Sequence, residues 1–349
     1  MLGIAVTNNG RSLNIRARKA VLVATGGSSG NVNFRRMLDP RLTEEMCGLA
    51  GMPWSNQDAS GELASMAVGA SLWGAANYSL EIGDNITKPG KIGCQYGYVN
   101  LTWMPGSRVF DRAGASGLRV TDWQNVICVN MLGKRFYDEM GPQYPGNRYN
   151  TVKPYTPHNP INAKNVKFDA ANWIPAALGG IDDGKNGGGA IWAIFDADAA
   201  AREKWTTEYP WVDTKNGFFF SANTIGGLAS KIKMKFQRVP MPPENLEQTV
   251  ARYNSFVDAG TDEDFGKPKP LYKIAKPPFF AAWSMPVIHD SRAGLRINAK
   301  CQVVDMNGEV IAGLYSGGET AGGFSMHGLA RCLCQGYIAG HAAHAENSI

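Results

Sequence analysis

The stretch that decides the fold is Gly313-Leu-Tyr-Ser-Gly-Gly-Glu-Thr-Ala-Gly-Gly-Phe-Ser-Met-His-Gly-Leu-Ala-Arg331, near the carboxyl end of the chain. Its pattern predicts a short apolar strand, a glycine-rich turn and a helix that runs through Gly336 and Gly340 towards His344. Glycine lets the backbone itself approach a ligand, and the first N–H groups of a helix attract negative charge. The stretch is therefore a candidate cradle for a cofactor, although an ordinary packed helix after a loop gives the same pattern.

The predicted last helix also has a face of small residues. Gly328, Cys332, Gly336 and Gly340 recur every four residues and so share one side of the helix. A face without bulky side chains predicts that this helix lies close against a sheet.

A second glycine turn follows a strand near the amino end. Asn8-Asn-Gly10 separates strand-like runs at 4–7 and 13–17 and predicts a hairpin, because Asn-Gly tolerates positive φ angles. A third apolar run, 20–24, leads directly into Thr25-Gly26-Gly27. An apolar strand that ends in Thr-Gly-Gly places bare backbone at the carboxyl edge of a sheet, where ligands of open α/β sheets bind.

Two further helices are predicted from the spacing of apolar residues. One covers 58–70, with Asp58 or Ser60 available to cap its start. The other follows Pro242-Pro243, carries apolar residues on one face and ends at Gly260.

The middle of the chain differs in composition from both ends. Between about residues 71 and 275 it is richer in turns and aromatic residues, whereas strand-like runs dominate before and after it. Sheet elements that bracket an insert predict one discontinuous domain, 1–70 with 276–349, and a second domain, 71–275. The inserted tryptophans are Trp73, Trp103, Trp123, Trp173, Trp192, Trp205 and Trp211, and large aromatics of this kind more often fill a core than line a substrate site.

Composition narrows the class of protein. The 349 residues are 44% hydrophobic and 19% charged, which is typical of a soluble globular protein. The formal charge of +5, from 35 basic and 30 acidic residues, is spread along the chain and argues against nucleic-acid binding. No apolar run is long enough to span a bilayer and no signal peptide precedes the first strand, so we expect a cytoplasmic protein. The six cysteines lack metal-site spacing and are expected to be reduced and mostly buried.

Six motifs in one order resemble the FAD-dependent fumarate reductase and succinate dehydrogenase flavoprotein superfamily, which includes 3-ketosteroid dehydrogenases. The resemblance covers nearly the whole chain. The motifs lie at 17–27, 61–70, 129–136, 249–254 with 262–265, 277–281 and 313–319.

The resemblance implies an α/β fold with an α+β cap: an incomplete, discontinuous Rossmann-like FAD-binding domain with an inserted substrate-capping domain. FAD is the implied cofactor, Glu319 is expected to accept from a ribityl hydroxyl, and the last helix is expected to begin near His327 and to aim its N–H groups at the flavin pyrimidine oxygen. The expected cofactor contacts are Thr25, Gly26, Gly27, Gly317, Gly318, Glu319, Gly323, His327, Gly328 and Leu329.

The sequence departs from this family in its phosphate-binding motif. No G-x-G-x-x-G turn, which holds the FAD pyrophosphate in the family, occurs in the chain. We therefore expect a second subunit that carries this half of the FAD site, or a fragment of a longer protein. An electron-transfer partner and a small-molecule substrate are also expected.

The second departure concerns the substrate. Fumarate reductases carry an arginine-bearing loop where this chain has only Ser325-Met326-His327, and Arg331 lies inside the following helix. A dicarboxylate substrate therefore loses support, and the aromatic insert favours an apolar or aromatic one. In this interpretation Arg331 is either a site residue or an ion-pair residue that steadies the helix.

The catalytic candidates follow from the same resemblance. Tyr144 and Arg148 compete for the position of the proton-transfer residue, and His289, Arg292 and His327 are expected around the flavin ring. By contrast, Lys134-Arg135 is predicted to be a solvated hairpin tip, with Tyr137 and Glu139 supporting the turn by hydrogen bonds.

These observations lead to the hypothesis of an FAD-dependent oxidoreductase subunit that passes a hydride between flavin N5 and a C–C or C–O bond. The alternatives are a non-catalytic assembly or regulatory subunit of a flavoenzyme complex, and an enoate reductase similar to fumarate reductase. An NAD-binding dehydrogenase has little support, because the dinucleotide fingerprint is absent from the sequence.

Overall fold

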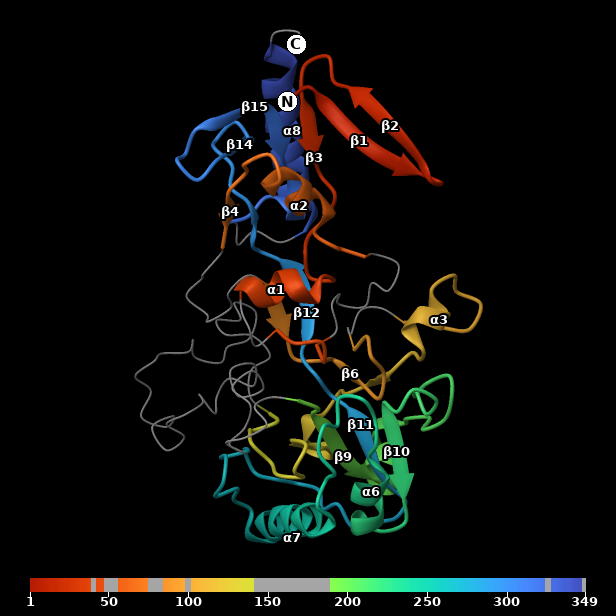
Figure 1. Cartoon of the computed structure of the whole chain (residues 1–349). Helices are drawn as coiled ribbons and strands as arrows, with labels where there is room; N and C mark the ends of the chain where they lie inside the picture. The colour runs from red at the N-terminus through yellow and green to blue at the C-terminus, as the bar shows by residue number, and fades with distance from the viewer. Residues whose placement is uncertain are drawn as a thin grey trace. The chain divides into compact units, whose positions relative to one another are not determined.

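The computed structural model describes residues 1–38, 42–46, 56–74, 84–97, 102–140, 189–323 and 328–346. The chain folds into two compact units, each with its own sheets and core (Figure 1). Unit 1 comprises Met1–Leu42, Asn56–Asn85 and Ile288–Ile349, and unit 2 comprises Thr43–Ser55 and Ile86–Val287.

Unit 1 begins with the hairpin that the sequence predicts. Strands β1 (Gly3–Asn8) and β2 (Arg11–Arg16) pair antiparallel, and they are drawn in red in Figure 1. Asn9 and Gly10 form the turn with φ angles of 48° and 76°, the left-handed values that a tight hairpin turn requires. The hairpin prediction is confirmed.

A three-stranded sheet carries the two glycine turns of unit 1. Its order is β14 (Gln302–Val304), β15 (Val310–Ser316) and β3 (Val21–Val23). Strand β15 runs antiparallel to β14 and parallel to β3, so that β3 and β15 end at the same edge. The core beneath the sheet consists of Ala70, Leu295, Ile297, Cys301, Val303, Leu314, Tyr315, Ala321 and Ala339.

Short elements complete unit 1. Helix α2 is shorter than its predicted range, and its first residue, Ser60, donates its backbone N–H to Asp58 Oδ1 at 3.0 Å. Strands β5 and β12 pair, and the chain passes from one unit to the other within them. The elements are α1 (Val32–Leu38), α2 (Ser60–Met66), β4 (Leu72–Trp73), β5 (Asp84–Thr87), β12 (Val287–Ser291), β13 (Gly294–Leu295) and the 3-10 helix η3 (Gly318–Thr320).

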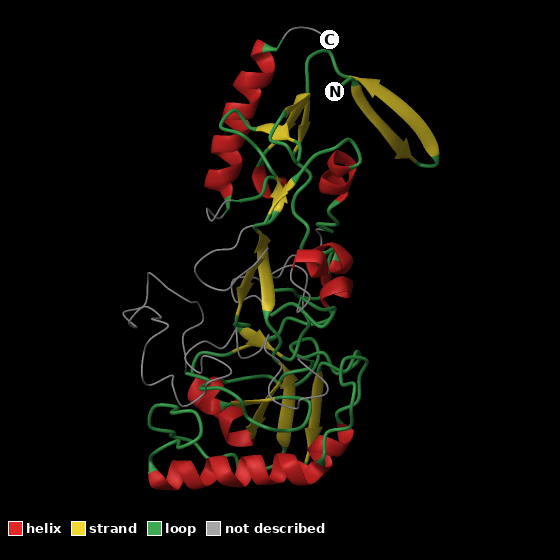
Figure 2. Cartoon of the chain, turned by 60° about the vertical axis from the view of Figure 1, so that its left-hand side comes forward, coloured by secondary structure: helices red, strands yellow, loops and turns green. Residues whose placement is uncertain are grey.

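Helix α8 (Leu329–Ala345) lies beside β15 in both views (Figures 1 and 2), but through a different face from the predicted one. Its buried residues are Arg331, Gln335 and Ala339, whereas Gly336 and Gly340 are exposed and an added Cβ would meet no atom within 4 Å. The prediction of a glycine-faced contact is wrong. Residues four apart share a face on any side of a helix, so this spacing does not determine which face is buried. Here the buried face is the one whose Arg331 and Gln335 side chains form hydrogen bonds with the rest of unit 1.

Unit 2 is built on a four-stranded antiparallel sheet (Figure 2). Its order is β10 (Phe219–Ala222), β11 (Phe279–Trp283), β9 (Trp192–Asp196) and β8 (Ile127–Val129). Every residue of β9 and β11 is buried, which explains their continuous apolar runs. Trp192 packs edge-on against Trp283, with ring centroids 5.7 Å apart.

Helices and short strands surround this sheet. Helix α7 begins at Pro243 and ends before Gly260, whose φ of 70° closes it, so the predicted limits of this helix are confirmed. Trp103, Trp123 and Trp192 are buried and Trp205 is half-buried, whereas Trp73 and Trp211 are exposed, so the predicted packing role holds for only part of the set. Trp173 lies outside the described residues. The elements are β6 (Lys91–Ile92), α3 (Phe110–Ala113), β7 (Leu118–Arg119), the 3-10 helix η1 (Trp123–Asn125), α5 (Ala197–Glu203), α6 (Ile225–Lys231) and α7 (Pro243–Ala259).

In the part of the chain that the structure describes, no helix has the length and apolar character needed to cross a membrane. Of the described cysteines, Cys94, Cys128 and Cys301 are buried, and Cys332 and Cys334 are exposed. Most of these thiols are therefore buried, as expected.

Candidate cofactor-binding site

The two glycine turns meet at one edge of the unit 1 sheet. Ser316 at the end of β15 lies opposite Val23 at the end of β3, and Gly317 N–H donates to Val23 O at 3.2 Å. The Thr320 hydroxyl donates to Gly26 O at 2.8 Å and ties the second turn to the first. Parallel strands that end together present two stretches of backbone at the position where open α/β sheets bind ligands.

Glycine is required in these turns for two different reasons. Gly26 and Gly318 have φ angles of 88° and 71°, which residues with a Cβ rarely adopt. At Gly27 an added Cβ would lie 2.3 Å from Ser291 Oγ. That oxygen accepts from the N–H groups of the two residues after Gly27, at 2.8 and 3.1 Å, so it is fixed in place.

Polar side chains hold the second turn from both sides. Gln57 Nε2 donates to Glu319 Oε2, and Gln335 Oε1 of α8 accepts from Gly318 N–H at 2.8 Å. Glu319 itself is half-buried. The turn is therefore anchored to the segment before α2 and to the last helix.

Arg331 anchors the start of α8 to the same edge. Its side chain is buried, and the guanidinium donates to Ser291 O at 3.3 Å and to Ala321 O. Arg331 thus binds backbone carbonyls rather than serving only as an ion-pair residue on the helix. Nearby, Gly323 N–H donates to Arg292 O at 3.0 Å.

Glu62 is a buried carboxyl group at the start of α2. Its side chain is 0% exposed, and neither carboxyl oxygen has a hydrogen-bond partner among the described residues. Burial, assisted by the charges of Asp58 and Glu319, raises the pKa of Glu62 to about 7. The neighbouring Gly61 lies against Thr25, since an added Cβ would be 2.1 Å from Thr25 Oγ1. A buried polar group without a partner costs free energy, so a ligand with hydroxyl groups would stabilise this edge.

Comparison with known proteins shows the family to which the chain belongs. Residues 96–334 match a family model described as an FAD binding domain, which spans well over half of the chain. The chain belongs to the FAD binding domain family. FAD is therefore its cofactor, and the superfamily that the sequence motifs resemble is confirmed.

Two curated relatives with named activities are similar in sequence to this chain. NADH:acrylate oxidoreductase of Vibrio harveyi is 32% identical over 69% of the chain, and the match covers 20% of that relative. Vinyl phenol reductase of Lactiplantibacillus plantarum is 33% identical over 31% of the chain, and the match covers 21% of that relative. Each of these two matches thus covers only about a fifth of the relative's length.

A solved structure shares the fold. The crystal structure of 3-ketosteroid delta1-dehydrogenase from Sterolibacterium denitrificans aligns with a TM-score of 0.56 at 20% sequence identity. The alignment covers 99% of this chain and 57% of that protein. The two proteins therefore share a mixed α/β fold.

The predicted FAD contacts divide into three groups. Thr25, Gly26 and Gly27 lie at the common sheet edge with Gly317, Gly318 and Glu319. Helix α8 begins at Leu329, two residues after its expected start, and Gly328 precedes it without a side-chain cap. His327 lies outside the described residues.

Most of the predicted catalytic residues lie outside the part of the chain that the structure describes. Tyr144 and Arg148 lie outside the described residues, as does the side chain of His289, whose backbone belongs to β12. Arg292 is half-buried beside Gly323. These assignments therefore stay predictions.

Sequence reasoning missed several residues of the edge. Glu62 resembles any acidic residue in the first turn of a helix, and that position by itself suggests only a favourable helix dipole. Gln57, Ser291 and Gln335 come from three distant segments and carry no motif. Only the three-dimensional pairing of β3 with β15 brings them together.

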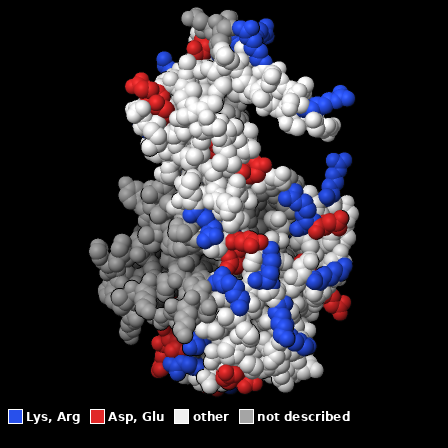
Figure 3. Space-filling model, in the orientation of Figure 1, with Lys and Arg blue, Asp and Glu red and all other residues white. Residues whose placement is uncertain are grey.

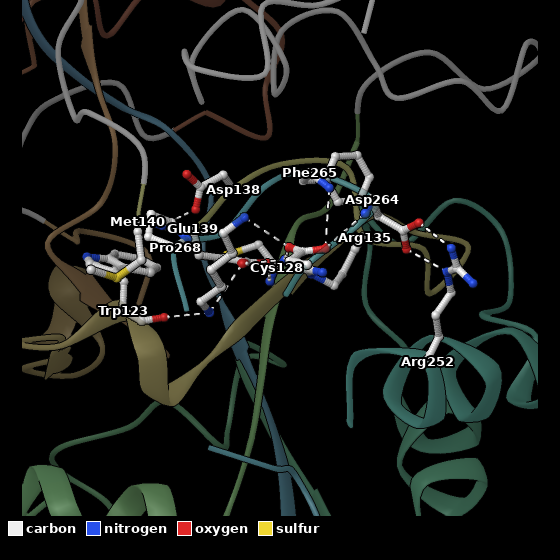
Figure 4. Close-up of polar contacts among 12 residues, drawn as sticks. Trp123, Cys128, Arg135, Asp138, Glu139, Met140, Arg252, Asp264, Phe265 and Pro268 are labelled. Carbon is white, nitrogen blue, oxygen red and sulfur yellow. Dashed lines mark hydrogen bonds and ion pairs between the residues drawn. The ribbon is translucent and has the colours of Figure 1, made fainter. Parts of the chain in front are cut away.

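Unit 2 contains a separate network of buried charges (Figure 4). Arg135 binds Glu139 through two hydrogen bonds of 3.0 and 2.8 Å and Asp262 through one of 2.9 Å. Lys267 Nζ lies 3.3 Å from Glu139 Oε2. All four side chains are buried, so the prediction that Arg135 belongs to a solvated hairpin tip is wrong. A guanidinium with two carboxylate partners tolerates burial, whereas the neighbouring Lys134 is exposed.

Glu139 also supports the turn, as predicted, because it accepts from Cys128 N–H at 3.0 Å. Burial opposes its charge, but Arg135 and Lys267 outweigh that effect and lower its pKa to about 2. Lys88 sits 3.5 Å above the Trp123 ring, and burial lowers its pKa to about 8.

Two further observations concern metal sites and the distribution of surface charge. Among the described residues, no group of three or more His, Cys, Asp or Glu side chains could hold a metal ion. Figure 3 shows basic and acidic side chains interspersed over the face in view.

Proposed function

We propose that this chain is the flavin-holding part of an FAD-dependent oxidoreductase that moves a hydride between flavin N5 and a C–C or C–O bond. The observation that carries the proposal is the joint end of β3 and β15, which bears two glycine turns. Gly61 lies against Thr25 of the first turn, and the buried carboxyl of the next residue, Glu62, has no partner among the described residues. FAD supplies the redox chemistry when bound. The protein binds the cofactor, keeps water out and moves one proton.

The edge residues have distinct parts in this proposal. The backbone of Thr25, Gly26 and Gly27 lies along the flavin, and Glu319 accepts from a ribityl hydroxyl. Glu62 accepts from a second hydroxyl of the cofactor or donates to one of its oxygens, because a carboxyl with a pKa near 7 is populated in both forms. The first N–H groups of α8, around Gly328 and Leu329, stabilise negative charge on the pyrimidine edge of the flavin.

Catalysis in the proposal rests on residues that follow the buried network. Tyr144 or Arg148 transfers the proton, with His289, Arg292 and His327 around the ring. Glu139 and Arg135 fix the segment that leads towards Tyr144. A change of proton-transfer rate in Tyr144→Phe or Arg148→Met, seen by stopped-flow flavin reduction, would support the assignment, and unchanged rates in both would overturn it.

The proposal also covers the organisation of the protein. We keep the assignment of 1–70 with 276–349 to an incomplete Rossmann-like FAD-binding domain and of 71–275 to a capping domain. A second subunit with a G-x-G-x-x-G turn completes the pyrophosphate site, because the sequence has no such turn. The expected cytoplasmic location stays a prediction.

The substrate is proposed to be apolar or aromatic. Acrylate and vinyl phenol, named for two relatives, both contain a carbon–carbon double bond, which favours a C–C over a C–O bond here as well. The arginine-bearing loop of fumarate reductases has no counterpart in this sequence, which weighs against a dicarboxylate.

Flavin binding tests the proposal. The purified chain should bind FAD and change the flavin fluorescence, although more weakly than a complete site would, because the pyrophosphate half of the site is assigned to the second subunit. Glu62→Ala and Glu319→Ala should weaken this binding about tenfold each, as expected for a buried hydrogen bond to a charged group. Glu309→Ala is the matched control, because Glu309 is an exposed acidic residue of unit 1. Equal affinity in all four proteins would contradict the assigned site and favour a non-catalytic subunit.

A further inference from the structure

The three-stranded sheet of unit 1 has an open edge at β3. In the order β14–β15–β3 this strand comes last, and no described strand pairs with its other side. Val23 O accepts from Gly317 N–H and so points towards β15. Successive residues of a strand direct their backbone groups to opposite sides, so the N–H and C=O of Leu22 point to the open edge. Such an edge is a template for a further strand.

The side chain of Leu22 is uncovered as well, at 44% exposed. Leu22 lies opposite Tyr315 in the register of β3 with β15, so both side chains face the same side of the sheet. Tyr315 is buried there, and its hydroxyl donates to Glu346 Oε1 at the end of α8 at 2.5 Å. Helix α8 therefore covers β15 on this side of the sheet and leaves β3 for a second element.

Helix α8 presents an apolar face to its surroundings. Only Arg331, Gln335 and Ala339 of this helix are buried. The opposite face consists of Leu329, Leu333, Gly336, Tyr337 and Gly340. It carries no Lys, Arg, Asp or Glu, and its three large side chains are between 66% and 75% exposed. A helix that is apolar on both sides is expected to be buried on both sides, so this face is a candidate contact surface.

The hairpin of unit 1 adds a third apolar surface. Ile4 pairs with Ile15 and Val6 with Leu13, and these two cross-strand pairs share one face of the hairpin. Ile4, Leu13 and Ile15 are exposed. Figures 1 and 2 both show the hairpin extending on the side of β3 that is away from α8. A two-stranded hairpin is marginally stable alone, so this face also calls for a partner.

The proposed function indicates which partner fits these surfaces. It requires a polypeptide with a G-x-G-x-x-G turn, which joins the end of a parallel strand to the start of a helix. A strand paired parallel to β3 would end at the same edge as Thr25-Gly26-Gly27, so its turn would lie beside the candidate FAD site. The Sterolibacterium denitrificans structure shows that the fold includes further chain, since the alignment covers 99% of this chain but 57% of that protein.

We propose that the open edge of β3, the Leu22 side chain and the outward face of α8 form the docking surface for a strand–turn–helix unit of the second subunit. The strand of this unit pairs with β3, and its helix packs beside α8 on Leu22 and Leu333. The hairpin face covers the added strand from the other side. The identity of the partner rests on the proposed function, whereas the surface itself rests on the exposed residues of unit 1.

The probe is a polypeptide with a G-x-G-x-x-G turn that co-purifies with the tagged chain from its source cells and is then produced separately. Calorimetric titration with this probe should show about tenfold weaker binding for Leu333→Gln and for Leu22→Gln, because each places an unpaired amide in the interface. The probe should also slow hydrogen exchange of the Leu22 amide, which a strand added at this edge would protect. Leu271→Gln is the matched control, since Leu271 is a leucine of unit 2 with a similar exposure of 46%, and it should bind the probe as the wild type does.

FAD binding by the chain alone separates this inference from the proposed function. Leu22 and Leu333 are not among the assigned FAD contacts, so both variants should bind FAD as the wild-type chain does. Wild-type affinity for the probe in both variants, with FAD binding intact, would overturn the docking surface and leave the proposed function standing. No flavin binding by the chain or its complex, with the variant effects as expected, would overturn the proposed function alone. Recovery of no such polypeptide, or a dimer of the chain that both variants dissociate in sedimentation, would overturn the choice of partner.

Discussion

The sheet edge of unit 1 and the charge network of unit 2 each bury a carboxyl group, but only the one in unit 2 has charged partners among the described residues. In unit 2, Arg135 and Lys267 surround Glu139, so the buried carboxylate has cationic partners. In unit 1, Glu62 is equally buried, yet neither of its oxygens has a partner among the described residues. The pKa of Glu139 is lowered to about 2, whereas that of Glu62 is raised to about 7.

This difference separates a structural site from a binding site. A network with its charges paired stabilises the fold and has little to offer a ligand, although removal of one member is costly. A buried carboxyl that has no partner among the described residues lowers stability until a ligand supplies its hydrogen bonds. The edge of unit 1 is therefore the better candidate for the cofactor.

The largest loss of stability is expected for a substitution in the charge network of unit 2. Glu139→Gln should lower the free energy of unfolding by about 3 to 5 kcal/mol, because it leaves Lys267 and part of Arg135 buried without a charge partner. Glu44→Gln is the control, since it breaks an exposed pair with Lys235 and should cost about 0 to 1 kcal/mol. Urea unfolding measures both. Similar losses in the two variants would show that the network does not stabilise unit 2.

The same network predicts a pH dependence. The folded pKa of Glu139 lies below its ordinary value of 4.5, so its contribution to stability is complete above pH 4.5 and is lost as the pH falls towards about 2.

Glu62 should give the opposite pH dependence. Its folded pKa of about 7 lies above the ordinary 4.5, so its contribution to stability is complete below pH 4.5 and is lost as the pH rises through about 7. The loss should approach about 3 kcal/mol, at 1.36 kcal/mol for each pKa unit. Hydrogen exchange of the α2 amides in the FAD-free chain, corrected for intrinsic rates, measures it. Glu62→Gln should remove this dependence, and an unchanged dependence in that variant would assign it to another group.

The glycine turn gives a smaller effect. Gly27→Ala should lower the free energy of unfolding by about 1 to 3 kcal/mol, because the new Cβ would lie 2.3 Å from the fixed Ser291 Oγ. It should also weaken FAD binding, since the turn must move. Thermal unfolding and FAD titration test the two effects, and a variant with wild-type stability would mean that the turn adapts without cost.

The smallest expected change in stability is a gain, in helix α8. Gly336→Ala places a Cβ on the exposed face of α8, where no atom lies within 4 Å, and should stabilise the helix by about 0.5 to 1 kcal/mol. A loss of stability instead would indicate that the small-residue face of α8 is covered after all.

Much of the local structure could be predicted from the sequence. The Asn9-Gly10 turn, the strand before Thr25 and the end of α7 at Gly260 follow from local backbone preferences, which neighbouring residues determine. The family and its cofactor were predicted from motifs that span nearly the whole chain. These features depend on order along the sequence, which a sequence displays directly.

Features that depend on distant partners were not predictable. Arg135 looked solvated because its second carboxylate, Asp262, lies 127 residues away. The buried face of α8 follows from contacts of Arg331 and Gln335 with two strand ends, and nothing in the helix spacing reveals them. Glu62 is noticed only when its burial and missing partners are known.

Hydrogen exchange with and without FAD tests the central claim most directly. If the joint end of β3 and β15 holds the cofactor, saturating FAD should slow exchange in 25–29, 60–63 and 317–320, and leave β9 and β11 of unit 2 unchanged. Glu62→Ala should show the same pattern only at higher FAD concentration. Protection that appears elsewhere, with these three segments unchanged, would contradict the assignment of the FAD site.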